Sequence, residues 1–307
     1  MSVAIIEDTY CEAFEGLCCQ LMITAQDAEF LNKAAYAFTA LPSTVFGDAE
    51  AGIVRWLTEN ETIDGRLGAI IQLWVNGIGK KATAKLYEQL GRRIRQGVLV
   101  IPTTAIFDFY PFKTEMKFNM MDNVGHCGDG YEDLIYRLER KMISVPIMMG
   151  YDFLIEEELS YAKGIMGGNL WLFCDSVDSG INIGRETVKI IHEIDNVCNI
   201  FEVCSAGSKI ETNFPEIGPT TNHPYCPTLK GKIPVEEFKV PEGVNSIPEI
   251  VFNALDLDSI EMTMLQVIEG IINMDGLIKI SAGNYGGKLG KYKILLRELG
   301  LKESYFS

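Results

Sequence analysis

The order of its periodic segments constrains the fold of this chain most strongly, because the same order occurs in both halves. In the first half, alternating apolar residues predict strands, and apolar residues spaced by three and four predict helices. The predicted order is strand, helix, strand, strand, helix, strand, over residues 17–25, 28–38, 43–57, 68–75, 80–96 and 98–107. This β-α-β-β-α-β order is typical of a ferredoxin-like unit.

The second half repeats this order. Strands are predicted at 169–176, 199–205, 249–255 and 277–282, and helices at 182–195 and 259–273. A predicted hairpin with the sequence "SVPIMMGYDFLIEEEL" links the two halves near residue 146. We therefore predict an α+β fold with two ferredoxin-like (βαββαβ) lobes in tandem, an N-terminal lobe over residues 1–146 and a C-terminal lobe over residues 147–307.

A long insertion, about 206–247, separates the second and third strands of the C-terminal lobe. It is rich in Pro, Asn, Thr and Gly and shows no periodicity. Loops of this length are usually functional or disordered. The stretch "GPTTNHPYCPT" favours a binding role, and a solvated surface loop is the alternative.

The charge of the chain excludes several classes of partner. Lys and Arg number 27 against 42 Asp and Glu, which gives a net charge of −15. This charge repels phosphate backbones and anionic membrane surfaces, so we expect no nucleic acid and no membrane as partner. No apolar run reaches the roughly 18 to 20 residues of a bilayer span, and the N-terminus lacks a signal-peptide pattern, so we expect a cytoplasmic protein.

The eight cysteines show no C-x-x-C spacing and lie mostly in apolar strands, which favours buried thiols in a reducing compartment. Two short clusters, His126-Cys127 and His223 near Cys226, lack the spacing of a zinc site. We therefore predict no metal. His192 lies in an amphipathic stretch and is interpreted as a residue of a helix face rather than a base.

The stretch "KISAGNYGGKLG", residues 279–290, is a glycine-rich loop after an apolar strand. Its spacing fits neither a P-loop nor a dinucleotide fingerprint. Glycine permits positive φ and close backbone approach, so the stretch predicts a tight passage between two strands. Asn284 and Lys288 are its candidates for contact with a ligand.

Several further motifs are found in a fixed order along nearly the whole chain. They are "IEDTYCEAFE", "LMITA", "AEAGI", "ETIDGRLG", "GDGY", "GGN", "GSK", "YCPT" and "EIVFN", followed by the glycine-rich loop. Together they resemble the formylmethanofuran:tetrahydromethanopterin formyltransferase family. The resemblance implies two ferredoxin-like lobes, a homo-oligomer built as a dimer of dimers, and a role in the one-carbon metabolism of methanogenesis or formaldehyde oxidation. It also implies no bound cofactor, with methanofuran and tetrahydromethanopterin as small-molecule C1 carriers and substrates.

Formyl transfer between two amines passes through a tetrahedral carbon that carries a developing oxyanion, so the site must supply hydrogen-bond donors and a proton. The resemblance assigns Glu249, in "EIVFN", as the catalytic residue. The alternative from the residues alone is that Glu249 lies on a solvated strand face with Val251 and Asn253. Candidates for substrate binding are Asn222, Tyr225 and Thr228 in the insertion, and Asn284 and Lys288 in the glycine-rich loop.

Some positions depart from the family pattern. The chain has "GDAEAG" where the family usually has C-P-A-E-A-G, and "TNHPYCPT" where it usually has T-N-D-A-Y-C-P-T. These departures leave a second reading open. In this second hypothesis, the chain is a catalytically inactive paralogue that acts as a structural or assembly subunit of a C1-transfer complex.

Overall fold

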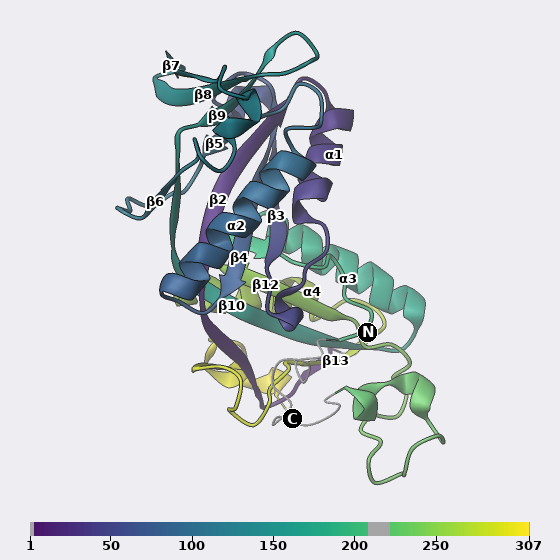
Figure 1. Ribbon diagram of the computed structural model, residues 1–307. Helices are drawn as coiled ribbons and strands as arrows, with labels where there is room; N and C mark the ends of the chain where they lie inside the picture. Colours follow the sequence, from purple (N-terminus) through teal and green to yellow (C-terminus); the bar gives the residue numbers. More distant parts are fainter. Residues whose placement is uncertain (1–2, 208–221, 307) are drawn as a thin grey trace. The chain divides into compact units, whose positions relative to one another are not determined.

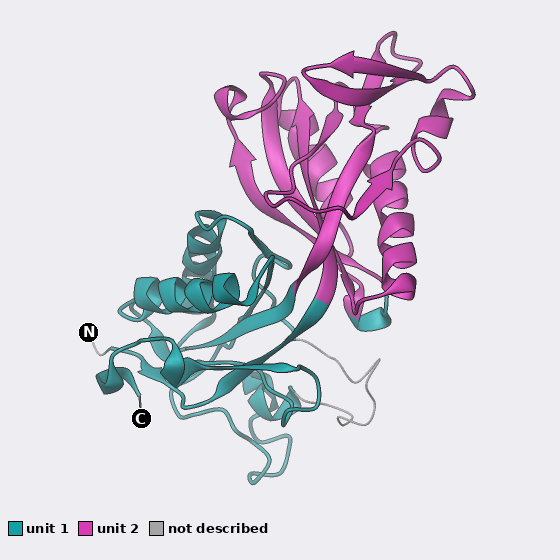
Figure 2. Ribbon diagram, turned by 90° about the vertical axis from the view of Figure 1, so that its left-hand side faces the viewer, with its two compact units in different colours: residues 1–15, 45–47, 165–307 teal, residues 16–44, 48–164 magenta. Residues whose placement is uncertain are grey.

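The computed structural model describes residues 3–207 and 222–306 (Figure 1). The chain forms two compact units (Figure 2). Unit 1 contains residues 1–15, 45–47 and 165–307, and unit 2 contains residues 16–44 and 48–164. No helix among the described residues is long and apolar enough to cross a membrane.

This division differs from the boundary predicted between residues 146 and 147. The physical reason is that two long strands, β2 (Tyr10–Ala25) and β10 (Glu158–Cys174), each begin in one unit and end in the other. The first residues of β2 pair with β14 (Tyr292–Leu295) in unit 1, and its remainder pairs with strands of unit 2. Periodicity along the chain detects the repeat, but it does not show that two strands are shared between the units.

Unit 2 contains the first predicted repeat. Its elements after β2 are α1 (Ala28–Thr39), β3 (Glu50–Leu57), β4 (Leu67–Asn76), α2 (Lys80–Gly97) and β5 (Ala105–Asp108). The strands pair in the order β3, β4, β2, β5, all antiparallel. A meander of β7 (Asp133–Arg137), β8 (Arg140–Pro146) and β9 (Asp152–Glu156) continues the sheet, with β9 parallel to β5. The hairpin of β8 and β9 confirms the one predicted near residue 146.

Unit 1 contains the second repeat. Its elements after β10 are α3 (Val177–His192), β11 (Val197–Asn199), β12 (Glu249–Ala254), α4 (Leu257–Ile271) and β13 (Leu277–Ser281). The strands pair in the order β11, β12, β10, β13, and β1 (Ile5–Ile6) adds to β13 in parallel. Element order and strand order are therefore the same in both units. The prediction of an α+β fold with a tandem repeat is confirmed.

The helices form where apolar spacing and capping residues agree. The Asp27 carboxylate accepts a hydrogen bond from the backbone N–H of Phe30 and caps α1, and Ser176 and Asp256 cap α3 and α4 in the same way. The buried face of α2 contains Leu86, which packs with the sheet of unit 2. The short elements are β6 (Lys117–Asn119) and the 3₁₀ turns Thr44–Phe46, Glu59–Glu61, Gly125–Gly128, His223–Tyr225, Pro227–Leu229, Leu296–Glu298 and Glu303–Tyr305.

Three predicted strands are shorter than expected. Residues 43–49 contain a 3₁₀ turn, so the strand begins only at Glu50. After α2 the chain turns, with the Thr104 hydroxyl bonded to the carbonyl of Val98, so residues 98–104 are not a strand. Residues 200–205 form only the isolated bridge of Cys204. In each case a segment with apolar residues does not join a strand ladder, and Phe46, Val100 and Phe201 in these segments are exposed.

The sheet of unit 1 has two different faces. Residues such as Leu172 and Phe252 point to the helices α3 and α4 and form the main core of the unit. Their neighbours, Trp171 and Phe173 on β10, lie on the opposite face. The insertion covers this second face with Val244 and with partly buried apolar residues, among them Tyr225 and Val240. The functional site lies between this cover and the sheet.

Candidate active site

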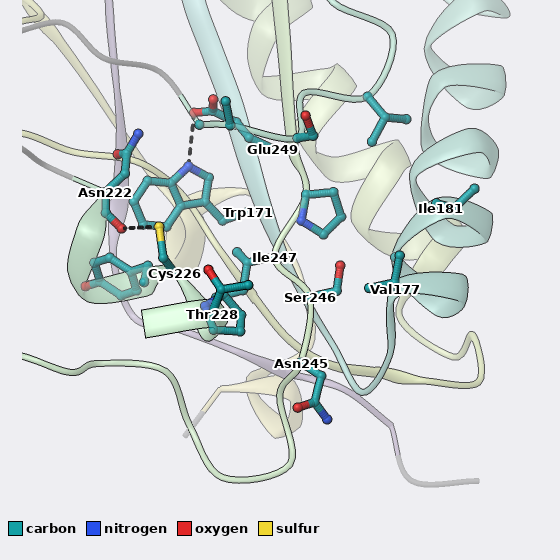
Figure 3. A pocket seen from close by; sticks show the side chains of 18 residues that line it. Trp171, Val177, Ile181, Asn222, Cys226, Thr228, Asn245, Ser246, Ile247 and Glu249 are labelled. Carbon is teal, nitrogen blue, oxygen red and sulfur yellow. Dashed lines mark hydrogen bonds between the residues drawn. The ribbon is translucent and has the colours of Figure 1, made fainter. Parts of the chain in front are cut away.

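A pocket of about 410 Å³ lies in unit 1 between the start of β12, the start of α3 and the insertion. Figure 3 shows Glu249 and Trp171 on one side of it and Val177 and Ile181 of α3 on another. The pocket is also lined by Asn222, Tyr225, Cys226 and Thr228 of the insertion, and by Asn245, Ser246 and Ile247 before β12. Polar and apolar side chains both line the pocket, which suits an organic ligand with a polar reacting group.

Glu249 is the first residue of β12 and is only 2% exposed. Its Oε1 accepts a hydrogen bond of 3.0 Å from the indole Nε1 of Trp171, the residue directly opposite in the sheet. Val251 and Asn253, which share this strand face, are 8% and 0% exposed. The alternative of a solvated strand face is therefore wrong, because the insertion and neighbouring segments cover it.

Cys204 lies on the other side of Glu249. The two residues exchange backbone hydrogen bonds of 2.9 and 3.0 Å in an isolated antiparallel bridge. Burial raises the pKa of the Cys204 thiol, the charge of Glu249 and a hydrogen bond to its carboxyl group raise it further, and backbone hydrogen bonds from Ala206 and Gly207 lower it. The thiol therefore stays protonated at neutral pH.

The insertion brings three predicted residues to the pocket. Tyr225 packs edge to face on Trp171, with ring centroids 4.9 Å apart. Burial, followed by the charge of Glu7, raises the pKa of Tyr225, so its hydroxyl is neutral. Asn222 and Thr228 line the same pocket. Part of the predicted binding segment, residues 208–221, lies outside the described residues.

The glycine-rich loop binds an anion, and that anion is a side chain of the same chain. The carboxylate of Glu12, 1% exposed, accepts hydrogen bonds from the backbone N–H groups of Tyr285, Gly287, Leu289 and Gly290 at 2.7, 2.5, 2.9 and 3.1 Å. Burial raises the pKa of Glu12, but the four donors together outweigh burial and hold the pKa below its ordinary value. The predicted close passage is also present, because a Cβ on Gly290 would lie 2.6 Å from the carbonyl oxygen of Ala13.

Asn284 and Lys288 do not line the pocket that contains Glu249. Both are exposed, and the amide of Asn284 donates to the Thr9 hydroxyl at 2.9 Å. The structure thus brings together Asn222, Tyr225, Thr228 and Glu249, but not the two residues of the loop. A substrate-facing role for these two stays a prediction.

Sequence reasoning missed Trp171, Cys204 and Glu12. Trp171 occurs in a predicted strand, but its position opposite Glu249 depends on the register between strands distant in the sequence. Cys204 was assigned to a strand that does not form. The only signal for Glu12 was its place in "IEDTYCEAFE", one of the motifs that carry the resemblance.

Five cysteines are buried, namely Cys11, Cys18, Cys19, Cys174 and Cys198, and the other three are partly buried. Within residues 3–207 and 222–306, no group of three or more His, Cys, Asp or Glu residues is arranged to hold a metal ion. His192 is the last residue of α3, and burial lowers its pKa. Among the described residues, the pocket is lined by the Glu249 carboxyl group and by polar side chains that include Asn222 and Thr228.

Comparison with known proteins agrees with these features. A family model described as formylmethanofuran-tetrahydromethanopterin formyltransferase matches residues 1–147, and a second, described as FTR, proximal lobe, matches residues 151–299. A formylmethanofuran--tetrahydromethanopterin formyltransferase-like protein of Archaeoglobus fulgidus is 51% identical over 294 residues, which are 96% of this chain and 96% of the relative.

Two solved structures have the same fold. One is the formylmethanofuran:tetrahydromethanopterin formyltransferase from Methanosarcina barkeri, with a TM-score of 0.86, 37% identity, and coverage of 97% of this chain and 100% of that one. The other is the formyltransferase/hydrolase complex from Methylorubrum extorquens in complex with methylofuran. Its matching chain has a TM-score of 0.81 and 28% identity, with 97% of each chain covered.

Proposed function

Because the chain belongs to the formylmethanofuran-tetrahydromethanopterin formyltransferase family, we propose that it transfers a formyl group from N-formylmethanofuran to a ring nitrogen of tetrahydromethanopterin in one-carbon metabolism. The observation that carries this proposal is the buried carboxyl group of Glu249 in a pocket that is also lined by the polar side chains of Asn222, Tyr225 and Thr228. A carboxyl group in such a place can exchange a proton with a bound amine.

The reaction begins when the amine nitrogen of the acceptor attacks the formyl carbon. A carbon–nitrogen bond forms and the carbonyl electron pair moves to oxygen, which gives a tetrahedral oxyanion. We assign Glu249 to take the proton from the attacking nitrogen and to return it to the leaving nitrogen as the old carbon–nitrogen bond breaks. The charge of the carboxyl group is then the same before and after the transfer.

The oxyanion needs hydrogen-bond donors directed at it. In this proposal the Asn222 amide and the hydroxyl groups of Tyr225 and Thr228 serve as these donors or orient the two substrates, since all three line the pocket with Glu249. Transfer of a formyl group between two nitrogens changes no oxidation state. The proposal therefore includes no bound cofactor, and methanofuran and tetrahydromethanopterin take part as substrates.

The direct test uses the purified protein with formylmethanofuran and tetrahydromethanopterin, and follows the formation of formyl-tetrahydromethanopterin by absorbance. Transfer that saturates with both substrates supports the proposal. Absence of transfer in a folded protein, in an assay where a member with known activity works, contradicts it.

A second candidate function has its own support. The relative at 51% identity is named formyltransferase-like, whereas the solved formyltransferase is 37% identical. A chain that matches over 97% of its length is part of a formyltransferase/hydrolase complex. Both facts favour an inactive paralogue that acts as a structural or assembly subunit. No transfer by the isolated chain, together with stable binding to other subunits of a C1-transfer complex, supports this second candidate.

We also propose that the chain works in the cytoplasm as a homo-oligomer, a dimer of dimers. The edge strand β7 supports self-association, because among the described strands it pairs only with β8. Leu134 and Tyr136 on β7 are 57% and 75% exposed. An exposed edge strand with apolar side chains is a site where another chain can pair.

A further inference from the structure

Three side chains form a row on the sheet face that the insertion covers. Trp171 on β10 is directly opposite Glu249 on β12, and Cys204 is directly opposite Glu249 on its other side. Residues directly opposite in antiparallel strands direct their side chains to the same face. Glu249 is therefore held between an indole and a thiol by the pairing of three segments.

Both neighbours can donate a hydrogen bond to the carboxyl group. The indole Nε1 of Trp171 can only donate, and it lies 3.0 Å from Oε1. The Cys204 thiol is directed to the same face as this carboxyl group, and burial keeps the thiol protonated, so it can donate a second hydrogen bond. Both donors are neutral groups, and a hydrogen bond from either one stabilises the charged form of the carboxyl group.

Other titratable groups face this row from the surrounding elements. The Cys11 thiol, on β2, has its pKa raised to about 12 by burial, with a further contribution from the charge of Glu249. Tyr225 of the insertion packs on Trp171 with a neutral hydroxyl. Lys279 of β13 lies 4.5 Å from the centre of the Phe173 ring and pairs with Glu7 at 3.0 Å.

We propose that Trp171 and Cys204 are positioning residues, which orient the Glu249 carboxyl group by two neutral hydrogen bonds and set the pH at which it exchanges its proton. The inference rests on the proposed role of Glu249 in formyl transfer. It adds that proton exchange depends on two side chains that need not touch a substrate.

The first experiment requires no enzymatic activity. Protein labelled with ¹³C at the glutamate side-chain carboxyl is titrated by NMR without substrates, and the Glu249 resonance is assigned by its loss in Glu249→Gln. Hydrogen bonds to the charged form lower the pKa of a carboxyl group. Trp171→Phe should therefore raise the titration midpoint by about one pH unit, the size of one hydrogen bond to a charged group.

Two substitutions of Cys204 form a matched series, in which one removes the hydrogen-bond donor and the other retains it. Cys204→Ala removes the donor and should raise the midpoint by about half a pH unit, since a thiol is a weaker donor than an indole N–H. Cys204→Ser retains a donor of similar size and should return the midpoint to within about 0.3 unit of wild type. A residue needed only for packing would not show this rescue.

Two control variants repeat the same substitutions elsewhere. Trp74→Phe removes an indole that donates to the neutral side chain of Gln72 at 3.0 Å in unit 2. Cys174→Ala removes a buried thiol of β10 that faces the helices. Neither variant should move the Glu249 midpoint.

The second experiment is the pH-rate profile of formyl transfer. In Trp171→Phe and Cys204→Ala the limb assigned to Glu249 should move in the same direction as the NMR midpoint, with kcat changed more than KM. Midpoints that stay at the wild-type value in both variants overturn the inference. If the wild type transfers no formyl group while the NMR midpoints shift as expected, the inference holds and the proposed function fails.

Discussion

At the scale of single residues, Glu12 explains why the glycine-rich loop has its conformation. Four backbone N–H groups of the loop point at one carboxylate, much as they would at a bound phosphate. The loop fits no phosphate-binding motif by its spacing, and the anion that it binds is the Glu12 carboxylate of β2. The Lys288 side chain of the loop is exposed.

The first prediction concerns the substitution Glu12→Gln. It places an amide NH₂ group against two of the four N–H donors, so we expect the free energy of unfolding to fall by about 3 kcal/mol at pH 7. The folded-state pKa of Glu12 lies below its unfolded value, so the carboxylate stabilises the fold above the unfolded pKa. That stability is lost as the pH falls through the folded-state pKa. Urea unfolding of wild type and variant at several pH values should therefore show a difference that shrinks in acid.

The control is Glu15→Gln on the same strand. Glu15 is 30% exposed and has a long ion pair of 3.7 Å with Lys291, so its substitution should cost less than about 1 kcal/mol. Equal effects of the two substitutions at pH 7 would show that the loop does not depend on Glu12.

At the scale of elements, the four helices could be predicted from the sequence because their signals are local. Apolar spacing and a capping residue mark each of α1, α3 and α4, and the structure differs from the prediction mainly at the ends. The strand predicted at 199–205 was largely wrong, because only pairing with distant residues decides whether an apolar run joins a sheet.

The candidate site could be predicted only in part. Glu249 was predicted through the resemblance, and Asn222, Tyr225 and Thr228 were predicted as residues of the long insertion. All four line one pocket. Trp171 could not be found, because the register of β10 on β12 is a long-range property. The cover that buries Glu249 comes from an insertion without any periodic signal.

The glycine-rich loop gives a second prediction, about Gly290. A Cβ at this position meets the backbone of β2, 2.6 Å from the carbonyl oxygen of Ala13, and backbone cannot move aside cheaply. Gly290→Ala should therefore lower the free energy of unfolding by about 2 to 3 kcal/mol. At Gly286, with φ +68° and open space, Gly→Ala should cost about 1 kcal/mol from the backbone conformation alone. Chemical denaturation of both variants checks this order, and a larger loss at Gly286 would contradict it.

A third prediction tests the side chains of the same loop. Lys288 is exposed, so Lys288→Ala should leave the free energy of unfolding within about 0.5 kcal/mol of wild type. If Lys288 faces a substrate, KM should rise by about tenfold, which corresponds to about 1.4 kcal/mol of binding energy. Lys302→Ala, another exposed lysine of unit 1, is the control. An unchanged KM in Lys288→Ala would show that the lysine does not contact a substrate.

At the scale of the whole molecule, the two units have the same topology but differ in the side chains on the sheet face away from the helices. In unit 2 the sheet face away from the helices contains a neutral network, in which the Trp74 indole donates to Gln72 and the Gln72 amide donates to Gln20 at 2.8 Å. In unit 1 an indole donates instead to a carboxyl group, on a face that has a pocket. In the proposed function, the chemistry of unit 1 depends on this carboxyl group, which lies in a pocket.

The fourth prediction concerns assembly. A charge of −15 on each chain opposes association, and salt weakens this repulsion because the Debye length falls from about 10 Å at 0.1 M to about 3 Å at 1 M. Sedimentation should therefore show larger oligomers as salt increases. A monomer at every salt concentration would contradict self-association through the β7 edge.

The substitution Glu249→Gln tests whether Glu249 exchanges the proton during formyl transfer. The variant retains the size and one acceptor oxygen but cannot titrate. General acid-base catalysis contributes about 10² to 10⁴ in rate, so turnover should fall by that factor with KM little changed, and one limb of the pH-rate profile should disappear.

The comparison is made against wild type and against Glu242→Gln, a substitution of an exposed glutamate of the insertion, which should retain wild-type turnover. The measurement is formation of formyl-tetrahydromethanopterin from formylmethanofuran across the pH range. Glu249→Gln should transfer the formyl group slowly, and its pH-rate profile should lack the limb that reports Glu249. Transfer at the wild-type rate by this variant would contradict it.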